Sequence, residues 1–153
     1  MLLPAALRQR FGLLDDYSAG DAATLSDGTR VGVLICWEGI YAGAARALGQ
    51  AGAELLVNLS NDDWFGGHAA VEQHFRASLL RAVETRRFLL RATNSGVTAI
   101  VDPRGIVTAS APRDAPAVVA REVAAAAAET LYMRVGDVFA WSCLRVALAA
   151  LLV

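Results

Sequence analysis

The chain has 153 residues, of which 56% are hydrophobic and 19% charged, and its formal net charge is −1. This much apolar surface with so little net charge excludes an intrinsically disordered chain. The balance also argues against a nucleic-acid-binding protein, because no excess of cations is present to displace counterions from phosphates. The two cysteines lie far apart, which fits neither a disulfide scaffold nor a zinc site. All 14 basic residues are Arg, since the chain contains no Lys.

The first half of the chain predicts a strand–helix–strand unit. Residues 1–29 are rich in turn-forming Asp and Gly and are expected to be irregular, with no visible secretory signal. Residues 31–35 form a continuous apolar run, which is typical of a strand buried on both faces. A Gly- and Ala-rich helix is expected over 40–51, followed by a second buried strand over 54–59. This order predicts a βαβ unit with a right-handed crossover.

The second half begins with a polar loop over residues 60–68. Apolar residues spaced four apart then predict an amphipathic helix over 69–87. The turn at 102–105 predicts a hairpin, because Asp, Pro and Gly favour tight turns between strands. The strands expected in this half are 88–92, 96–101, a hairpin partner starting at Ile106, and 118–123.

Residues 138–153 are apolar except for Ser142 and Arg145. A helix of this length would span about 24 Å, which is less than the roughly 30 Å of a bilayer's hydrocarbon layer. Two interpretations stay open: a buried terminal helix, or the start of a membrane helix with Trp141 at the interface.

Cys36 is the candidate nucleophile, because it stands between a predicted strand and a predicted helix. A side chain at such a turn projects above the sheet, and a helix N-terminus favours the thiolate. The adjacent backbone N–H, that of Trp37, can stabilise an oxyanion. The alternative is a buried structural cysteine. Glu38 is either a carboxylate stabilised in the first helical turn or one that supports the site, and Cys143 in the apolar tail is expected to be inert.

The loop after the second strand carries polar and aromatic residues. Asn58, Ser60 and Asn61 can hold the loop by side-chain-to-backbone hydrogen bonds. Two interpretations are open for the loop aromatics Trp64 and Phe65. Either an apolar partner packs on them, or their loop closes on the protein's own core.

The two histidines invite a metal hypothesis. His68 and His74 lie near Asp62 and Asp63, but their spacing fits no familiar ligand pattern. We therefore expect no metal site. His74, on the amphipathic helix, is expected to be a hydrogen-bonded, buried or half-buried histidine.

Four segments occur in an order that resembles a known family: Gly32–Glu38, Asn58–Gly66, His74–Phe75 and Arg91–Ala99. Together they resemble the bacterial apolipoprotein N-acyltransferases, members of the nitrilase or carbon-nitrogen hydrolase superfamily. The resemblance extends from about residue 30 to residue 137.

The resemblance implies an α/β fold, with residues 1–137 forming the C-terminal part of a nitrilase-like αββα sandwich. Residues 138–153 would begin an incomplete transmembrane helix. The family's Glu-Lys-Cys triad implies that Cys36 is the nucleophile and that Glu38 is a supporting carboxylate. Trp37 occupies a position where family members often have Tyr.

The implied activity moves a fatty acyl chain from a phospholipid to the lipidated N-terminal cysteine of an apolipoprotein, through a thioester on the nucleophile. The implied partners are the phospholipid donor, the diacylglyceryl apolipoprotein acceptor and the membrane, with no cofactor and no nucleic acid. Lipid substrates suit Asn61, Trp64 and Phe65 as substrate contacts. The implied location is the bacterial inner membrane, with the catalytic domain facing the periplasm.

The sequence departs from this family in the triad itself. The family's Glu base and Lys come from upstream of the matched segments, and this chain has no Lys. Arg cannot replace Lys easily, because its guanidinium stays charged and has a different shape. We therefore expect the chain alone to be inactive and to expose sheet edges and core surface. A soluble nitrilase-type amidase and a non-catalytic remnant remain as alternatives.

Overall fold

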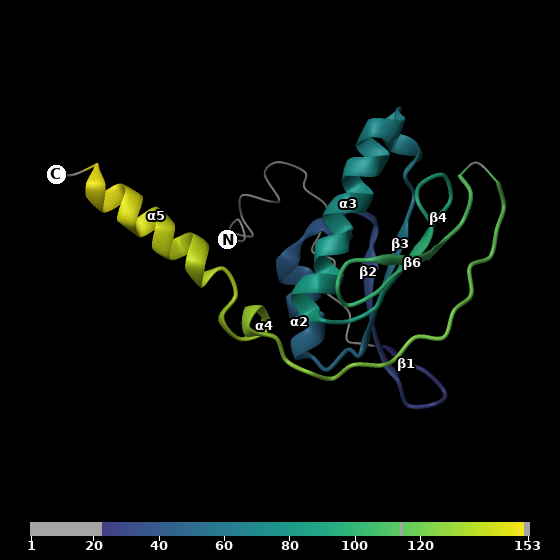
Figure 1. Cartoon of the computed structure of the whole chain (residues 1–153), viewed down its shortest axis with the longest axis horizontal. Helices are drawn as coiled ribbons and strands as arrows, with labels where there is room; N and C mark the ends of the chain where they lie inside the picture. The colour runs from purple at the N-terminus through teal and green to yellow at the C-terminus, as the bar shows by residue number, and fades with distance from the viewer. Residues whose placement is uncertain (1–22, 114, 152–153) are drawn as a thin grey trace, which may run out of the picture.

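A six-stranded mixed sheet forms the centre of the protein in the computed structural model, which describes residues 23–113 and 115–151 (Figure 1). The strands are β1 (Ala23–Thr24), β2 (Arg30–Ile35), β3 (Leu55–Ser60), β4 (Leu89–Thr93), β5 (Ala99–Val101) and β6 (Val107–Ser110), and they lie in the sheet in this order. The helices are η1 (Cys36–Ile40), α2 (Ala42–Gln50), η2 (Asp63–Phe65), α3 (His68–Thr85), α4 (Leu131–Val135) and α5 (Val138–Ala150).

The strands β2, β3 and β4 are parallel to one another, and the outer pairs are antiparallel. The βαβ unit expected from the sequence is confirmed, with α2 connecting β2 to β3. The hairpin is confirmed as well, because β5 pairs with β6 across the predicted turn. Leu34, Asn58 and Arg91 are register neighbours across the three parallel strands. The carboxyl ends of these strands therefore meet at one edge of the sheet.

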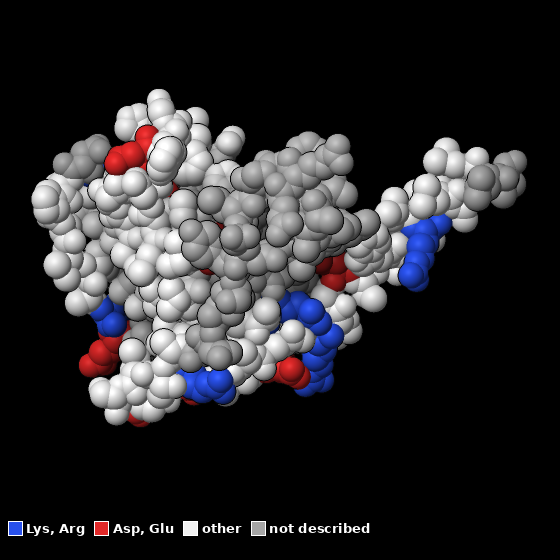
Figure 2. Space-filling view, turned by 180° about the vertical axis from the view of Figure 1, so that it is seen from behind, with Lys and Arg blue, Asp and Glu red and all other residues white. Residues whose placement is uncertain are grey.

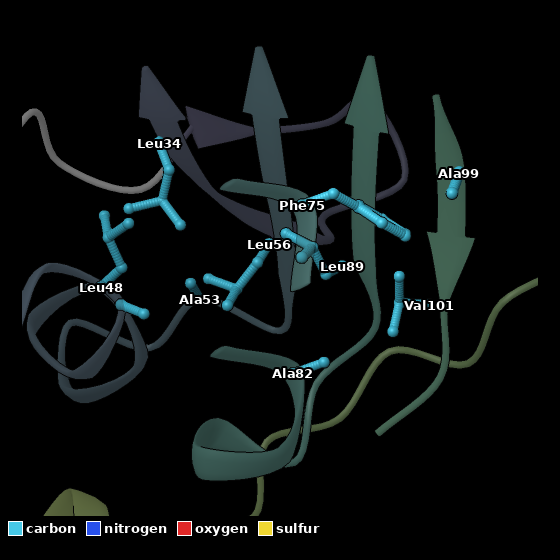
Figure 3. Packing of buried hydrophobic residues seen from close by; sticks show 10 residues of the cluster. Leu34, Leu48, Ala53, Leu56, Phe75, Ala82, Leu89, Ala99 and Val101 are labelled. Carbon is cyan, nitrogen blue, oxygen red and sulfur yellow. The ribbon is translucent and has the colours of Figure 1, made fainter. Parts of the chain in front are cut away.

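The helices α2 and α3 pack on one face of the sheet and enclose the hydrophobic core. Figure 3 shows Leu56, Leu89 and Phe75 together in front of the strands. A Cβ on Gly32 would come within 2.9 Å of the Leu48 side chain, so glycine allows α2 to approach β2 closely. The buried residues of this cluster are Leu34, Ala45, Leu48, Ala53, Leu56, Phe75, Ala82, Leu89, Ala99 and Val101.

The opposite face of the sheet is only partly covered, which differs from the fully buried strand expected at residues 31–35. In β2 the exposed fractions of Val33 and Ile35 are 38% and 55%, and that of Leu59 in β3 is 46%. These side chains alternate with buried ones because successive residues of a strand point to opposite faces. In Figure 2, which shows the molecule from behind, the visible charged side chains lie mainly in the lower half of the view and on the arm at the right.

Two expectations about strands are wrong. Residues 118–123 form no strand, and the Val118 side chain is 95% exposed, so this apolar run passes along the surface without a partner strand. The short strand β1 lies within a region expected to be irregular, where Ala23 pairs with Val31. The rest of that region, residues 1–22, lies outside the described residues.

The C-terminal helix α5 projects from the body of the protein (Figure 1). None of its residues is buried, so the interpretation as a buried terminal helix is wrong. Its 13 residues correspond to about 20 Å of helix. In the part of the chain that the structure describes, no helix combines the length and apolar character needed to cross a membrane. The transmembrane helix expected at residues 138–153 is therefore not supported by this structure.

Candidate active site

Cys36 lies where β2 ends and η1 begins, at the carboxyl edge of the parallel strands. Its backbone has a φ of 49°, in the left-handed region that residues other than glycine, Asn and Asp rarely adopt. The thiol is half-buried, and its Sγ lies 3.9 Å from the backbone oxygen of Asn61. One expectation is corrected here, because the following helix is a short 3-10 segment and α2 begins only at Ala42.

Glu38 folds back against the strand that precedes Cys36. Its Oε2 accepts a hydrogen bond from the backbone N–H of Ile35 at 2.7 Å. This contact ties the first turn of η1 to the end of β2, immediately before Cys36. In this conformation Glu38 therefore supports the backbone around the thiol.

A buried polar cluster lies beside the Cys36 turn, formed by Asp62, His74 and Arg91. Arg91 Nη2 donates to Asp62 Oδ2 at 2.8 Å, and both side chains are fully buried. His74 Nδ1 lies 3.1 Å from Asp62 Oδ1 and 3.0 Å from Arg91 Nη2. Ser60 Oγ also donates to Asp62 Oδ1, at 2.6 Å. A Cβ on Gly96 would come within 1.9 Å of Asp62 Oδ2, so only glycine leaves room for this carboxylate.

The charges in this cluster shift the pKa values of its members. Burial opposes ionisation of Asp62, but the hydrogen bond from Ser60 and the Arg91 charge outweigh it, so its pKa lies below the usual value. Burial and then the Arg91 charge lower the pKa of His74, against the opposing effects of Asp62 and the Cys36 backbone. His74 is therefore neutral near pH 7, while the Asp62 and Arg91 charges compensate each other.

Three rings cover the cluster on the side of Cys36. The ring centroids of Trp37 and His74 are 5.3 Å apart, and the planes of these two rings are nearly parallel. The ring centroid of Phe65 lies 5.7 Å from that of Trp37 and 5.1 Å from that of His74. Such separations are typical of favourable aromatic pairs. The Trp37 side chain remains 46% exposed. Cys36 is thus bordered by an apolar surface that solvent or a ligand can reach.

The structure brings four of the residues predicted from the sequence together: Cys36, Trp37, Asn61 and Phe65. Asn61 contributes its backbone oxygen near the thiol, while its side chain accepts a hydrogen bond from Asn94 Nδ2 at 2.8 Å. Trp64 does not join this group, because its side chain is 81% exposed.

The expectation of a hydrogen-bonded, buried His74 is confirmed. Sequence reasoning missed the roles of Asp62 and Arg91. A signal was present, because a charged residue within a predicted buried strand, such as Arg91 in 88–92, requires a buried partner.

Comparisons with known proteins agree with this fold. Residues 6–132 match the carbon-nitrogen hydrolase family. A crystal structure of a carbon-nitrogen hydrolase from Helicobacter pylori G27 superposes with a TM-score of 0.55 at 19% identity, covering 64% of this chain and 41% of that one. The chain therefore belongs to the carbon-nitrogen hydrolase family.

The names of its sequence relatives are more specific than the name of the family. The chain is 43% identical over 143 residues to an apolipoprotein N-acyltransferase from Geobacter metallireducens, which covers 93% of the chain and 27% of that relative. It is 47% identical over 97 residues to an apolipoprotein N-acyltransferase from Nitrosomonas europaea, covering 61% of the chain and 19% of the relative. The resemblance deduced from the sequence motifs is confirmed. The chain spans about a quarter or less of the length of these relatives.

Proposed function

We propose that this chain is the nucleophile-bearing part of an apolipoprotein N-acyltransferase. The observation that carries the proposal is the 43% identity to the Geobacter relative over 143 residues, a range long enough to include the whole described site. The position of Cys36 supports it, because a half-buried thiol at the carboxyl edge of a parallel sheet is accessible to a substrate.

The proposed chemistry proceeds through a thioester on Cys36. The thiolate attacks the ester carbonyl carbon of a phospholipid, the S–C bond forms and the ester C–O bond breaks. The glycerol oxygen takes up the proton that the base removed from the Cys36 thiol, and the lysophospholipid leaves. The α-amine of the lipidated N-terminal cysteine of an apolipoprotein then attacks the thioester carbonyl. The C–N bond forms, the C–S bond breaks, and the amine gives up its proton to a base.

The proposed base and the Lys of the family's triad come from sequence outside this chain. The chain has no Lys, and its Glu38 carboxylate is engaged with the backbone of Ile35. The native mass of the protein in its host's membrane fraction tests this point. A mass well above that of 153 residues, with a Lys-bearing segment upstream, supports it, and a mass equal to that of this chain contradicts it.

The substrates and the location belong to the same proposal. The exposed ring of Trp37 and the half-buried ring of Phe65 offer an apolar surface next to Cys36 for acyl chains, and the exposed ring of Trp64, one residue before Phe65, is a further proposed contact. In α5 the exposed fractions of Phe139 and Trp141 are 80% and 57%. We propose that α5 enters the bacterial inner membrane and that the site faces the periplasm. Retention of the natural protein in membranes after a carbonate wash supports this placement, and release contradicts it.

The natural gene product carrying Cys36→Ala provides the central test. We expect it to lose N-acylation of apolipoproteins and to form no hydroxylamine-sensitive acyl-enzyme with labelled phospholipid. Cys143→Ala is the matched control, because Cys143 is exposed on α5 and outside the site, and it should retain both properties. Normal acylation by Cys36→Ala would overturn the proposal.

The same measurements separate the two alternatives. A nitrilase-type amidase would release ammonia from small amides through Cys36 and would form no acyl-enzyme with phospholipid. A non-catalytic remnant would form no thioester at Cys36 with either substrate.

A further inference from the structure

The peptide bond between Cys36 and Trp37 has an orientation that the surrounding side chains fix. A peptide group is planar and trans, so its carbonyl oxygen and its N–H point in opposite directions. The carbonyl here belongs to Cys36 and the N–H to Trp37. Whatever holds the Cys36 oxygen therefore also aims the Trp37 N–H.

Asn58 on β3 holds this carbonyl from the core side of the sheet. Its Nδ2 donates to the backbone oxygen of Leu34 at 2.9 Å and to that of Cys36 at 3.2 Å. Both protons of one amide thus bridge the carbonyls on either side of Ile35, and the Asn58 side chain is fully buried. Gly39 allows this approach, because a Cβ there would come within 2.9 Å of the Asn58 side chain.

Arg91 on β4 fixes which way the Asn58 amide faces. It donates to Asn58 Oδ1 through Nη1, so the amide nitrogen has to point toward the Cys36 turn. Arg91 is held in turn by Asp62, through the 2.8 Å contact at Nη2. The order of contacts from the buried ion pair to the nucleophile is therefore Asp62, Arg91, Asn58 and the Cys36 carbonyl.

We propose that Asn58, oriented by Arg91, is a positioning residue that aims the Trp37 N–H at the oxyanion formed during acylation of Cys36. The role assigned to Cys36 rests on the proposed function. Asn58 touches no reacting atom in this scheme. It acts by keeping the carbonyl of the Cys36–Trp37 peptide turned toward the core, which leaves the N–H facing the opposite side.

The test compares two reactions of the same thiol in the full chain. Acylation by a p-nitrophenyl ester passes through a tetrahedral oxyanion, whereas alkylation by iodoacetamide does not. Dividing the acylation rate of Cys36 by its alkylation rate cancels thiol ionisation and access. Cys143 on the same chain, exposed on α5, supplies the reference ratio. Mass spectrometry of the two cysteine-bearing peptides gives all four rates.

We expect the Cys36 ratio to exceed the Cys143 ratio in the unchanged chain. In Asn58→Asp, which keeps an acceptor for Arg91 but loses the amide donors, the Cys36 ratio should fall about 10²-fold, the loss typical of one oxyanion donor. Ser78→Ala is the control, because Ser78 is also buried but donates only to the Phe75 carbonyl, and its ratio should not change. Where Asn58→Asp does not fold, Asn58→Ser makes the same comparison with one donor in place of two.

Equal ratios at Cys36 and Cys143 in the unchanged chain overturn the inference, and so does an Asn58→Asp chain in which acylation and alkylation change together. A phospholipid arm separates this inference from the proposed function. Failure of Cys36 to form a thioester with phospholipid in the natural gene product counts against the acyltransferase, while the nitrophenyl ester ratio still decides the role of Asn58.

Discussion

Arg91 and Asp62 form an ion pair at 2.8 Å in which neither side chain is exposed to solvent. They come from β4 and from the loop after β3, and they meet at the carboxyl edge where Cys36 also lies. Removing one member of such a pair leaves an uncompensated buried charge, which is far more costly than loss of the pair itself.

Asp62→Asn keeps the shape of the side chain and removes its charge. We expect the free energy of unfolding to fall by about 3–5 kcal/mol, the range typical of a broken buried pair. Glu129→Gln is the matched control, because Glu129 and Arg134 form an ion pair with exposed fractions of 49% and 65%. It should cost no more than about 1 kcal/mol. Urea denaturation of both variants measures the difference, and equal losses would show that the buried pair is not special.

His74 makes stability depend on pH near neutrality. Its pKa is lowered in the folded protein, chiefly by burial and then by the charge of Arg91, with Asp62 opposing. The unfolded chain therefore binds the proton more readily than the folded one. Stability from this group is fully present above the unfolded pKa of about 6.5 and is lost as pH falls from there toward the folded pKa.

His74→Phe, which retains a ring between Trp37 and Phe65, should remove this slope just below the unfolded pKa of about 6.5. Denaturation midpoints measured across that window provide the check. Ser78→Ala is the control, because Ser78 is buried on the same helix and carries no titratable group, so its removal should leave the slope intact. A slope that survives in His74→Phe would contradict the assignment.

Backbone strain at Cys36 predicts that glycine is more stable than alanine at position 36, whereas alanine is more stable than glycine at position 43. A φ of 49° is unfavourable for a residue with a Cβ by about 1–2 kcal/mol, but not for glycine. Cys36→Gly should therefore be more stable than Cys36→Ala, by up to about 1 kcal/mol once the greater unfolded-state entropy of glycine is subtracted. At Gly43 in α2, where φ is not positive, an added Cβ would meet no atom within 4 Å. Gly43→Ala should therefore stabilise the protein by about 0.5–1 kcal/mol.

Urea denaturation of the three variants and the unchanged chain measures both differences. Glycine should be the more stable choice at position 36 and alanine the more stable choice at position 43. The same sign at both sites would rule out strain at Cys36.

The two loop aromatics should separate substrate binding from stability. Trp64 is 81% exposed, so Trp64→Ala should leave the unfolding midpoint unchanged and raise KM for the proposed phospholipid donor in the natural protein. Phe65 packs against Trp37 and His74, so Phe65→Ala should lower both stability and activity. Thermal denaturation and initial-rate kinetics give the two readouts. A KM that is unaffected by Trp64→Ala would remove Trp64 from the substrate contacts.

The pattern of apolar and turn residues along the sequence was enough to predict most of the sheet and the position of the candidate nucleophile. The apolar runs leading to β2 and β3 and the turn before β6 are visible in neighbouring residues, as is the place of Cys36 between strand and helix. The strand expected at residues 118–123 does not form, because an extended run becomes a strand only by pairing with another strand, and this run pairs with none of the six. The sequence predicts a helix from residue 40, whereas α2 begins at Ala42, because residues 36–40 first close into a 3-10 turn.

The polar cluster could not be assembled from the sequence in the same way. Asp62, His74 and Arg91 come from a loop, a helix and a strand, and their contacts depend on the register of three parallel strands. The sequence indicated that Arg91 needed a partner but not which of the nearby carboxylates it would meet. Asn58 was expected to hold its own loop, whereas its amide reaches the neighbouring strand.

The alignment of Leu34, Asn58 and Arg91 across β2, β3 and β4 has a consequence for folding. A slip of one residue in β3 would turn Asn58 to the opposite face of the sheet and place Val57 or Leu59 beside the guanidinium of Arg91. An apolar neighbour cannot accept its hydrogen bond, so each slipped pairing would leave a buried guanidinium N–H without its acceptor. Apolar strands alone distinguish poorly between such pairings, because Val and Leu are interchangeable in contact. The buried amide of Asn58 and the buried guanidinium of Arg91 thus disfavour misaligned strand pairings while the sheet forms.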